Sequence, residues 1–124
     1  MQTFTEHPRQ LAFLLTEAEG TLSRDVVTVL SGAGVLEAGT VLAKVTASGK
    51  YVKSVDTASD GSQTAIAVLA RRVDATSADV ADALIVANDA EVKDDMLIFD
   101  ASVSDAAKRN TKLTQLRAVN IKAR

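Results

Sequence analysis

The apolar positions between residues 41 and 99 occur in short runs and not in long helical stripes. Along Val41–Ala47 the side chains of two faces alternate, and Gly39 and Gly49 bracket the run, which predicts a strand between two turns. Gly39 is expected to adopt a positive φ in the turn before this strand. Three more runs have turn-forming or charged residues at their ends: Ala65–Ala70, Ala83–Ala87 and Met96–Phe99. A β-rich scaffold is therefore predicted.

The other strand candidates have less uniform patterns. Val26–Leu30 is a β-branched run and predicts a strand, which a Gly-rich turn follows at residues 31–34. Ala65–Leu69 is apolar throughout, so this strand is expected to be buried on both faces. Residues 80–87 fit a helical face as well, but their β-rich second half favours a strand. A turn is expected at Asp74–Asp79, and Met96–Phe99 is expected to be a short buried strand.

Helical periodicity is clearest near the C-terminus. Residues 102–116 predict a helix that Ser102 or Ser104 caps, with Asp105 in the first turn. Its apolar stripe is expected to face the core: Val103, Ala106, Ala107, Leu113 and Leu116. Its basic residues are expected on the opposite face: Lys108, Arg109 and Lys112. A terminal strand around Ile121 should follow. A single helical turn at Thr16–Gly20 has the spacing of a capping box.

The first ten residues have no helical or strand periodicity and are predicted to form an extended arm. Pro8 favours an extended conformation at His7. The segment carries more apolar side chains than a solvated tail would: Phe4, Leu11, Phe13, Leu14 and Leu15. These residues pack either on their own domain or on a partner. The expected organisation is an extended arm over residues 1–15 and a single β-rich domain over residues 16–124.

Composition narrows the chemistry. The chain has 124 residues, no Cys and one His, so thiolate ligands, disulfides, a Cys nucleophile and a His-pair metal site are excluded. The net charge of −2 is unevenly distributed, with nine acids and one base in residues 74–105 and six bases without an acid in residues 108–124. No aromatic residue lies between those bases, so nucleic-acid binding is not expected. Neither a membrane span nor an export signal is expected.

Two local patterns resemble binding motifs but lack their context. The glycines at 32, 34 and 39 do not precede a helix, which a dinucleotide-binding loop requires. The adjacent carboxylates of Asp94 and Asp95 would point to opposite sides of an extended segment, so they are not expected to hold a metal together. No side chains are arranged for acid–base or nucleophilic catalysis, so no cofactor and no enzymatic activity are expected.

Several turn and strand signatures, in their order and spacing, carry a family resemblance. They are Val35–Leu42, Ala47–Tyr51, Asp60–Ala65, Ala67–Leu69, Asp74–Ser77, Leu97–Phe99 and Ala101–Thr111. A further similarity lies in the arm, at Thr3-Phe4-Thr5. Together they resemble the bacteriophage head decoration proteins typified by the lambda capsid-stabilising protein. The segment from Leu11 to Val26 departs from the lambda type because it is more apolar.

The resemblance implies a mainly β fold, a small β-barrel or β-tulip-like domain, with one C-terminal helix and an extended N-terminal arm. It also implies a homotrimer on the outer surface of the capsid of the virion, at three-fold or quasi-three-fold positions, which adds only after the shell has expanded. The partner would be the major capsid protein, with neither membrane nor nucleic acid bound directly, after synthesis in the host cytoplasm. The arm would order on the capsid through these residues: Thr3, Phe4, Thr5, Pro8, Leu11 and Phe13.

Two binding-module alternatives remain. A carbohydrate or small-ligand module would use similar Ala-Gly-Thr-Val-Leu hairpins, but it needs aromatic stacking platforms, and the chain has one Tyr and no Trp. A lipoyl- or biotinyl-type carrier domain needs a modified Lys at a hairpin tip. Lys44 lies inside a predicted strand, and Lys50 lacks the flanking signature.

Overall fold

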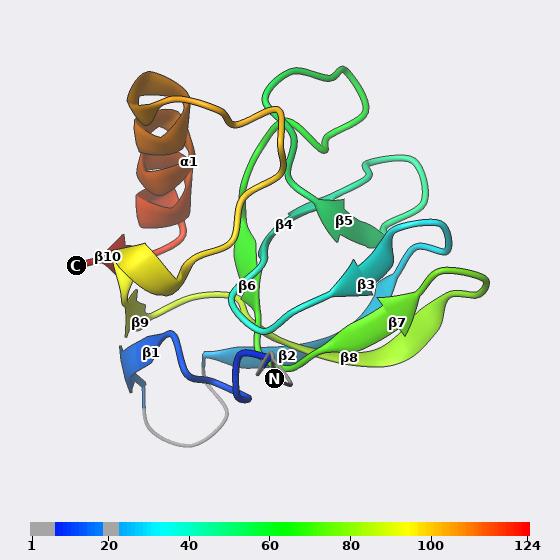
Figure 1. The fold of residues 1–124 in the computed structure, drawn as a ribbon, viewed down its shortest axis with the longest axis horizontal. Helices are drawn as coiled ribbons and strands as arrows, with labels where there is room; N and C mark the ends of the chain where they lie inside the picture. The colour runs from blue at the N-terminus through cyan, green and yellow to red at the C-terminus, as the bar shows by residue number, and fades with distance from the viewer. Residues whose placement is uncertain (1–6, 19–22) are drawn as a thin grey trace, which may run out of the picture.

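A computed structural model describes residues 7–18 and 23–124 and shows a β-barrel flanked by a small sheet and one helix (Figure 1). The strands are β1 (Leu14–Glu17), β2 (Arg24–Val29), β3 (Gly34–Leu36), β4 (Val41–Lys44), β5 (Tyr51–Lys53), β6 (Ala67–Leu69), β7 (Val73–Ala75), β8 (Val80–Val86), β9 (Ala90–Val92) and β10 (Ile121–Ala123). A 3-10 turn, η1 (Asp94–Met96), and the helix α1 (Ala106–Ala118) lie between β9 and β10. The predicted mainly β fold with one C-terminal helix is confirmed.

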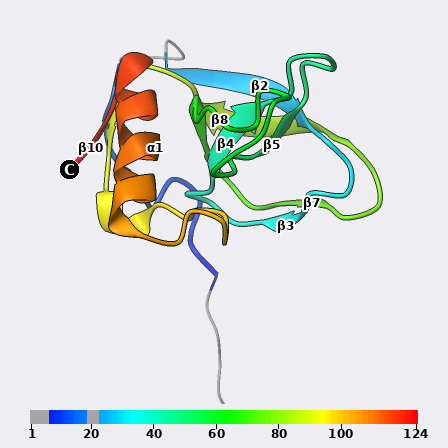
Figure 2. The same ribbon diagram turned by 90° about the horizontal axis from the view of Figure 1, so that it is seen from above.

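Three sheets build the domain. Strands β2, β5, β4, β6 and β8 close into a barrel in that order, β1, β9 and β10 form a three-stranded sheet, and β3 pairs with β7. In both ribbon views α1 and β10 lie to one side of the barrel, and β3 and β7 lie toward the other side (Figures 1 and 2). The two outer strands of the three-stranded sheet, β1 and β10, come from opposite ends of the chain.

The barrel strands separate two hydrophobic cores. Val68 belongs to an outer core, between the barrel and the flanking sheet and helix, whereas its neighbours Ala67 and Leu69 belong to a core inside the barrel. This division follows from the alternation of side chains along a strand. It confirms the prediction that the strand within Ala65–Leu69 is buried on both faces.

The strand predicted from Val41 is present but shorter than expected. β4 ends at Lys44, because the amide of Val45 turns to the carbonyl of Lys50 at 2.8 Å. Gly39 has φ +97°, which confirms the expected positive φ, and a Cβ there would lie 2.6 Å from the carbonyl oxygen of Met96. The strands predicted at residues 26–30 and 83–87 are also present, as β2 and β8.

Three local predictions were wrong. Residues 96–99 form no strand, because η1 takes Met96 and the following segment makes only an isolated bridge from Ile98 to Thr40. Thr16 and Glu17 belong to β1 and pair with β9, so no helical turn begins at Thr16. Residues 19 and 20 of that prediction lie outside the described residues. The turn expected over residues 74–79 begins late, because β7 extends to Ala75.

The C-terminal helix begins later than predicted, and its predicted core face is right in part. Leu116 is buried in the outer core and Leu113 packs against it, as expected. Asp105 is its N-cap, and its carboxylate accepts a hydrogen bond from the amide of Lys108 at 2.9 Å. Ala106 and Ala107 are exposed, although they were expected in the core. Lys112, expected in solvent, is 1% exposed, and its Nζ donates to the carbonyls of Val55 and Gln63 at 2.5 Å each. Lys112 therefore faces the loop before β6 and satisfies two of its carbonyl groups.

Candidate functional site

The N-terminal segment joins the domain at Leu11. The amide of Leu11 donates to the carbonyl of Ala70 at 2.8 Å, and its side chain is half-buried against the outer core. Phe13 is 1% exposed within that core, and its carbonyl accepts from the amide of Lys93 at 2.7 Å. Phe13 thus packs on its own domain, which is one of the two arrangements open to the apolar residues of this segment.

The rest of the predicted arm lies upstream of these contacts. Pro8 is exposed, as are His7, Arg9 and Gln10. Thr3, Phe4 and Thr5 lie outside the described residues. Of the predicted partner-binding residues, the structure brings Leu11 and Phe13 into the domain and leaves Pro8 accessible at its surface.

Beside the arm, β1 presents an open strand edge. In the described part of the chain β1 pairs only with β9, so the backbone groups along its other side face no strand. Leu15 on β1 is 44% exposed, and Val26 on β2 is 66% exposed. An edge strand with exposed apolar side chains is a surface on which another chain can pair.

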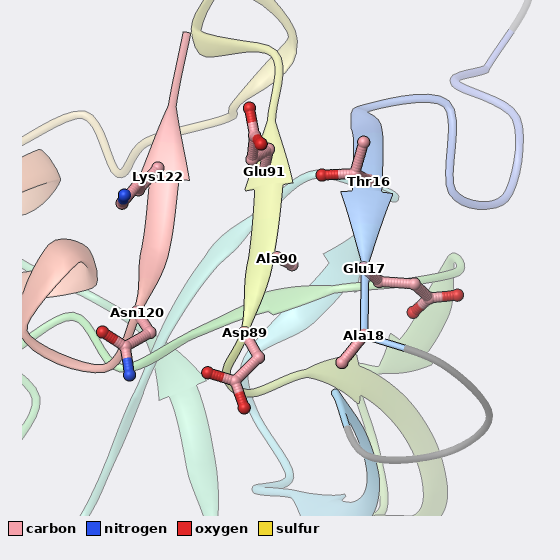
Figure 3. Close-up of a pocket in the computed structure, with 8 residues that line it drawn as sticks. All are labelled: Thr16, Glu17, Ala18, Asp89, Ala90, Glu91, Asn120 and Lys122. Carbon is pink, nitrogen blue, oxygen red and sulfur yellow. The ribbon is translucent and has the colours of Figure 1, made fainter.

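A shallow hollow of about 420 Å³ lies over the β1–β9–β10 sheet (Figure 3). Its lining is mostly polar: Thr16, Glu17, Ala18, Asp89, Ala90, Glu91, Asn120 and Lys122. Glu17 accepts hydrogen bonds from the Arg24 guanidinium at 2.5 and 2.9 Å, and Glu91 pairs with Arg124. None of the lining residues is a nucleophile hydrogen-bonded to a base. These two carboxylates therefore hold β1 and β9 to neighbouring parts of the fold.

The acidic residues of the loops have structural roles. Asp60 accepts from the hydroxyl and the amide of Ser62, and both hydrogen bonds hold the pKa of Asp60 below its ordinary value. Asp74 accepts from Thr76 in the same way, with the same effect on the pKa of Asp74. Within residues 7–18 and 23–124, no group of three or more His, Asp or Glu side chains is placed to hold a metal ion.

Three of the six bases of the C-terminal block pair with acids. Arg109 donates to the carboxylate of Asp94 and lies 4.5 Å from the ring centroid of Phe99. Lys108 lies 3.7 Å from Asp56, and Arg124 pairs with Glu91. These ion pairs between the basic block and acidic residues hold α1 and β10 to the rest of the domain.

The family described as bacteriophage lambda head decoration protein D matches residues 3–121. The chain belongs to this family. No individual curated protein matches it. The match extends from the N-terminal segment into β10, so the resemblance read from the turn and strand signatures is confirmed.

Membership in the head decoration family gives the chain a structural role on a phage capsid. The family is one of structural proteins and not of enzymes. In the part of the chain that the structure describes, no helix is long and apolar enough to cross a membrane.

The structure also adds residues that the sequence did not indicate. Upstream of Leu11, the arm makes a second contact, in which His7 lies 2.9 Å from Glu37 in the turn before β4. Arg72, beside β7, pairs with the same carboxylate. Glu37 and Arg72 are separated from the arm by about thirty and sixty-five positions. No local pattern could have found them, because only the tertiary fold brings them together.

Proposed function

We propose that this decoration protein binds as a homotrimer to the outside of the expanded phage head, at three-fold or quasi-three-fold positions. There it cross-links neighbouring copies of the major capsid protein and stabilises the shell against the pressure of the packaged DNA. The observation that carries the proposal is the family match over residues 3–121, which includes the arm as well as the domain.

The arm is the proposed capsid-binding element. An extended segment gains affinity from main-chain hydrogen bonds and from side chains placed in pockets, for which Phe4 and Pro8 are the candidate anchors and Thr3 and Thr5 flank the first of them. Leu11 and Phe13 contribute by holding the root of the arm on the domain. A force that pulls on the bound arm is then transmitted directly to the barrel.

Trimer formation supplies the affinity that one arm lacks. Each residue that becomes ordered on binding costs about 1–2 kcal/mol of backbone entropy, so a single arm binds weakly. Three arms on one trimer bind at a high effective concentration. Capsid binding should therefore be lost when the trimer dissociates.

Selectivity for the expanded shell follows if several capsid subunits build the receiving surface together. Those subunits come into register only in the mature lattice, so the unexpanded shell presents no complementary surface. The open edge of β1, with Leu15 exposed on that strand, provides a second contact region next to the arm.

The test is co-sedimentation of the purified protein with expanded and with unexpanded empty shells, with the bound copies counted. We expect saturable binding to expanded shells alone, in multiples of three. Equal binding to both shells, or none to either, would contradict the proposal. A truncation that removes residues 1–6 tests the arm and leaves Phe13 in its core, and it should bind much more weakly than the full chain.

A further inference from the structure

The place where the arm leaves the domain is fixed by one carboxylate. Nδ1 of His7 lies 2.9 Å from Oε1 of Glu37, and Nε of Arg72 donates to the same oxygen at 3.1 Å. Three segments that are distant in the sequence therefore meet at Glu37, and one of them is the arm.

Glu37 is itself held rigidly. Its carbonyl accepts from the amide of Thr40 at 3.2 Å and from the Thr40 hydroxyl at 2.7 Å. The same turn contains Gly39, whose amide donates to Leu69 and whose carbonyl accepts from Ile98, each at 2.9 Å. The backbone that carries this carboxylate is thus fastened to the barrel and to the segment after η1.

Only one of the two oxygens of the Glu37 carboxylate has a hydrogen-bond partner among the described residues. Oε2 of Glu37 is buried and has no hydrogen-bond partner among the described residues. Both contacts are made to Oε1, so loss of His7 would leave the carboxylate with Arg72 alone. The His7 side chain is 57% exposed, so this contact should stabilise the domain about as much as a surface ion pair does.

A second fixed point lies four residues further along. The amide of Leu11 donates to the carbonyl of Ala70, two residues before Arg72, and Leu11 has φ +60°. Between the two points Pro8 restricts the backbone of His7 to extended conformations. Residues 7–11 are thus tied to the domain at both ends, close to the β6–β7 turn.

We propose that Glu37 is the positioning residue of the arm: by holding His7 it fixes the orientation of the arm root, residues 7–11. The inference rests on the proposed capsid binding by the arm. A root held in one orientation lowers the entropy lost when the arm orders on its partner. It also keeps the three arms of a trimer at a constant spacing, which sustains their effective concentration.

The experiment compares four variants in binding to expanded shells. His7→Ala removes the imidazole, Glu37→Gln removes the charge of the carboxylate, and His7→Asn restores a polar nitrogen near the position of Nδ1. Lys50→Gln is the control, because it removes an ion pair with Asp79 that joins the β4–β5 turn to the β7–β8 turn. The heteronuclear NOE of the Arg9 and Gln10 amides in the free protein reports the order of the root independently of binding.

We expect His7→Ala and Glu37→Gln to bind about twofold to fivefold more weakly, the range that a partly exposed ion pair gives. The NOE values should fall in both variants, and His7→Asn should recover both readouts, with Lys50→Gln unchanged. Wild-type binding by His7→Ala, together with weak binding by the chain lacking residues 1–6, would overturn the positioning role and leave the arm proposal standing. Wild-type binding by that truncated chain would instead overturn the arm proposal. If Glu37→Gln binds weakly and His7→Ala does not, the effect of Glu37 comes from its ion pair with Arg72. That result would overturn the role of Glu37 in positioning the arm.

Discussion

Replacing Lys112 by Met tests whether the buried ammonium fastens α1 to the loop before β6. Met keeps most of the length of the side chain but leaves the carbonyls of Val55 and Gln63 without their donor. A hydrogen bond to a charged group contributes about 1.5–3 kcal/mol. Two are lost, and relief from burying the ammonium offsets part of the loss. We expect the free energy of unfolding to fall by about 2–4 kcal/mol.

The assay is urea unfolding followed by far-UV circular dichroism at one fixed protein concentration, since self-association would change the apparent stability. In thermal unfolding, the midpoint should fall by roughly 4 °C for each kcal/mol in a chain of this size. Lys108→Met is the matched control: its ammonium is partly exposed and lies 3.7 Å from Asp56, so the loss should stay below about 1 kcal/mol. A loss below about 0.5 kcal/mol for Lys112→Met would refute the reasoning.

The same variant makes a pH prediction. Burial lowers the pKa of Lys112 from its ordinary value of 10.5, against a smaller opposing effect of Asp56. The unfolded chain then binds more protons than the folded chain between the lowered pKa and 10.5, so the wild type gains stability as the pH rises through that window. Lys112→Met lacks this gain. The stability difference between wild type and Lys112→Met should therefore widen toward pH 10.5, and a narrowing difference would contradict the direction of the shift.

Three further substitutions test individual contacts by urea unfolding. Phe13→Ala should lose about 3–5 kcal/mol, because it empties a fully buried site, and a loss near zero would place Phe13 outside the core. Gly39→Ala should lose at least about 1 kcal/mol, because its Cβ would meet the carbonyl of Met96 at a positive φ; unchanged stability would contradict that close approach. Asp105→Ala should lose about 0.5–2 kcal/mol as a helix cap, whereas Ser104→Ala should change little, and the reverse order would restore the predicted serine cap.

The sequence predicted the elements whose patterns are local and strong. β6 and β8 were identifiable because their apolar runs are short and β-rich, and α1 because its periodicity extends over several turns. The positive φ of Gly39 was also predictable, since a turn had to precede β4. In each case neighbouring residues alone determine the conformation.

The elements that escaped prediction depend on distant partners. β3, β5, β7 and β9 have three residues each, too few for a period to show, and they exist because another strand lies beside them. Lys112 looked like a solvent-facing residue because helical periodicity cannot reveal the carbonyl groups of residues 55 and 63. The Glu37 cluster at the arm root escaped for the same reason.

The parallel pairing of β10 with β9 has a consequence for the timing of folding. Ile121 lies in β10, is fully buried in the outer core, and pairs with Ala90, while the opposite edge of β9 pairs with β1. The amide and the carbonyl of Arg124 are bound to Val92 and Asp94. During synthesis the barrel strands are complete before β10 has left the ribosome, so the barrel can form first while its outer face stays uncovered. Closure of that face then waits until residues 121–123 are available to pair with β9.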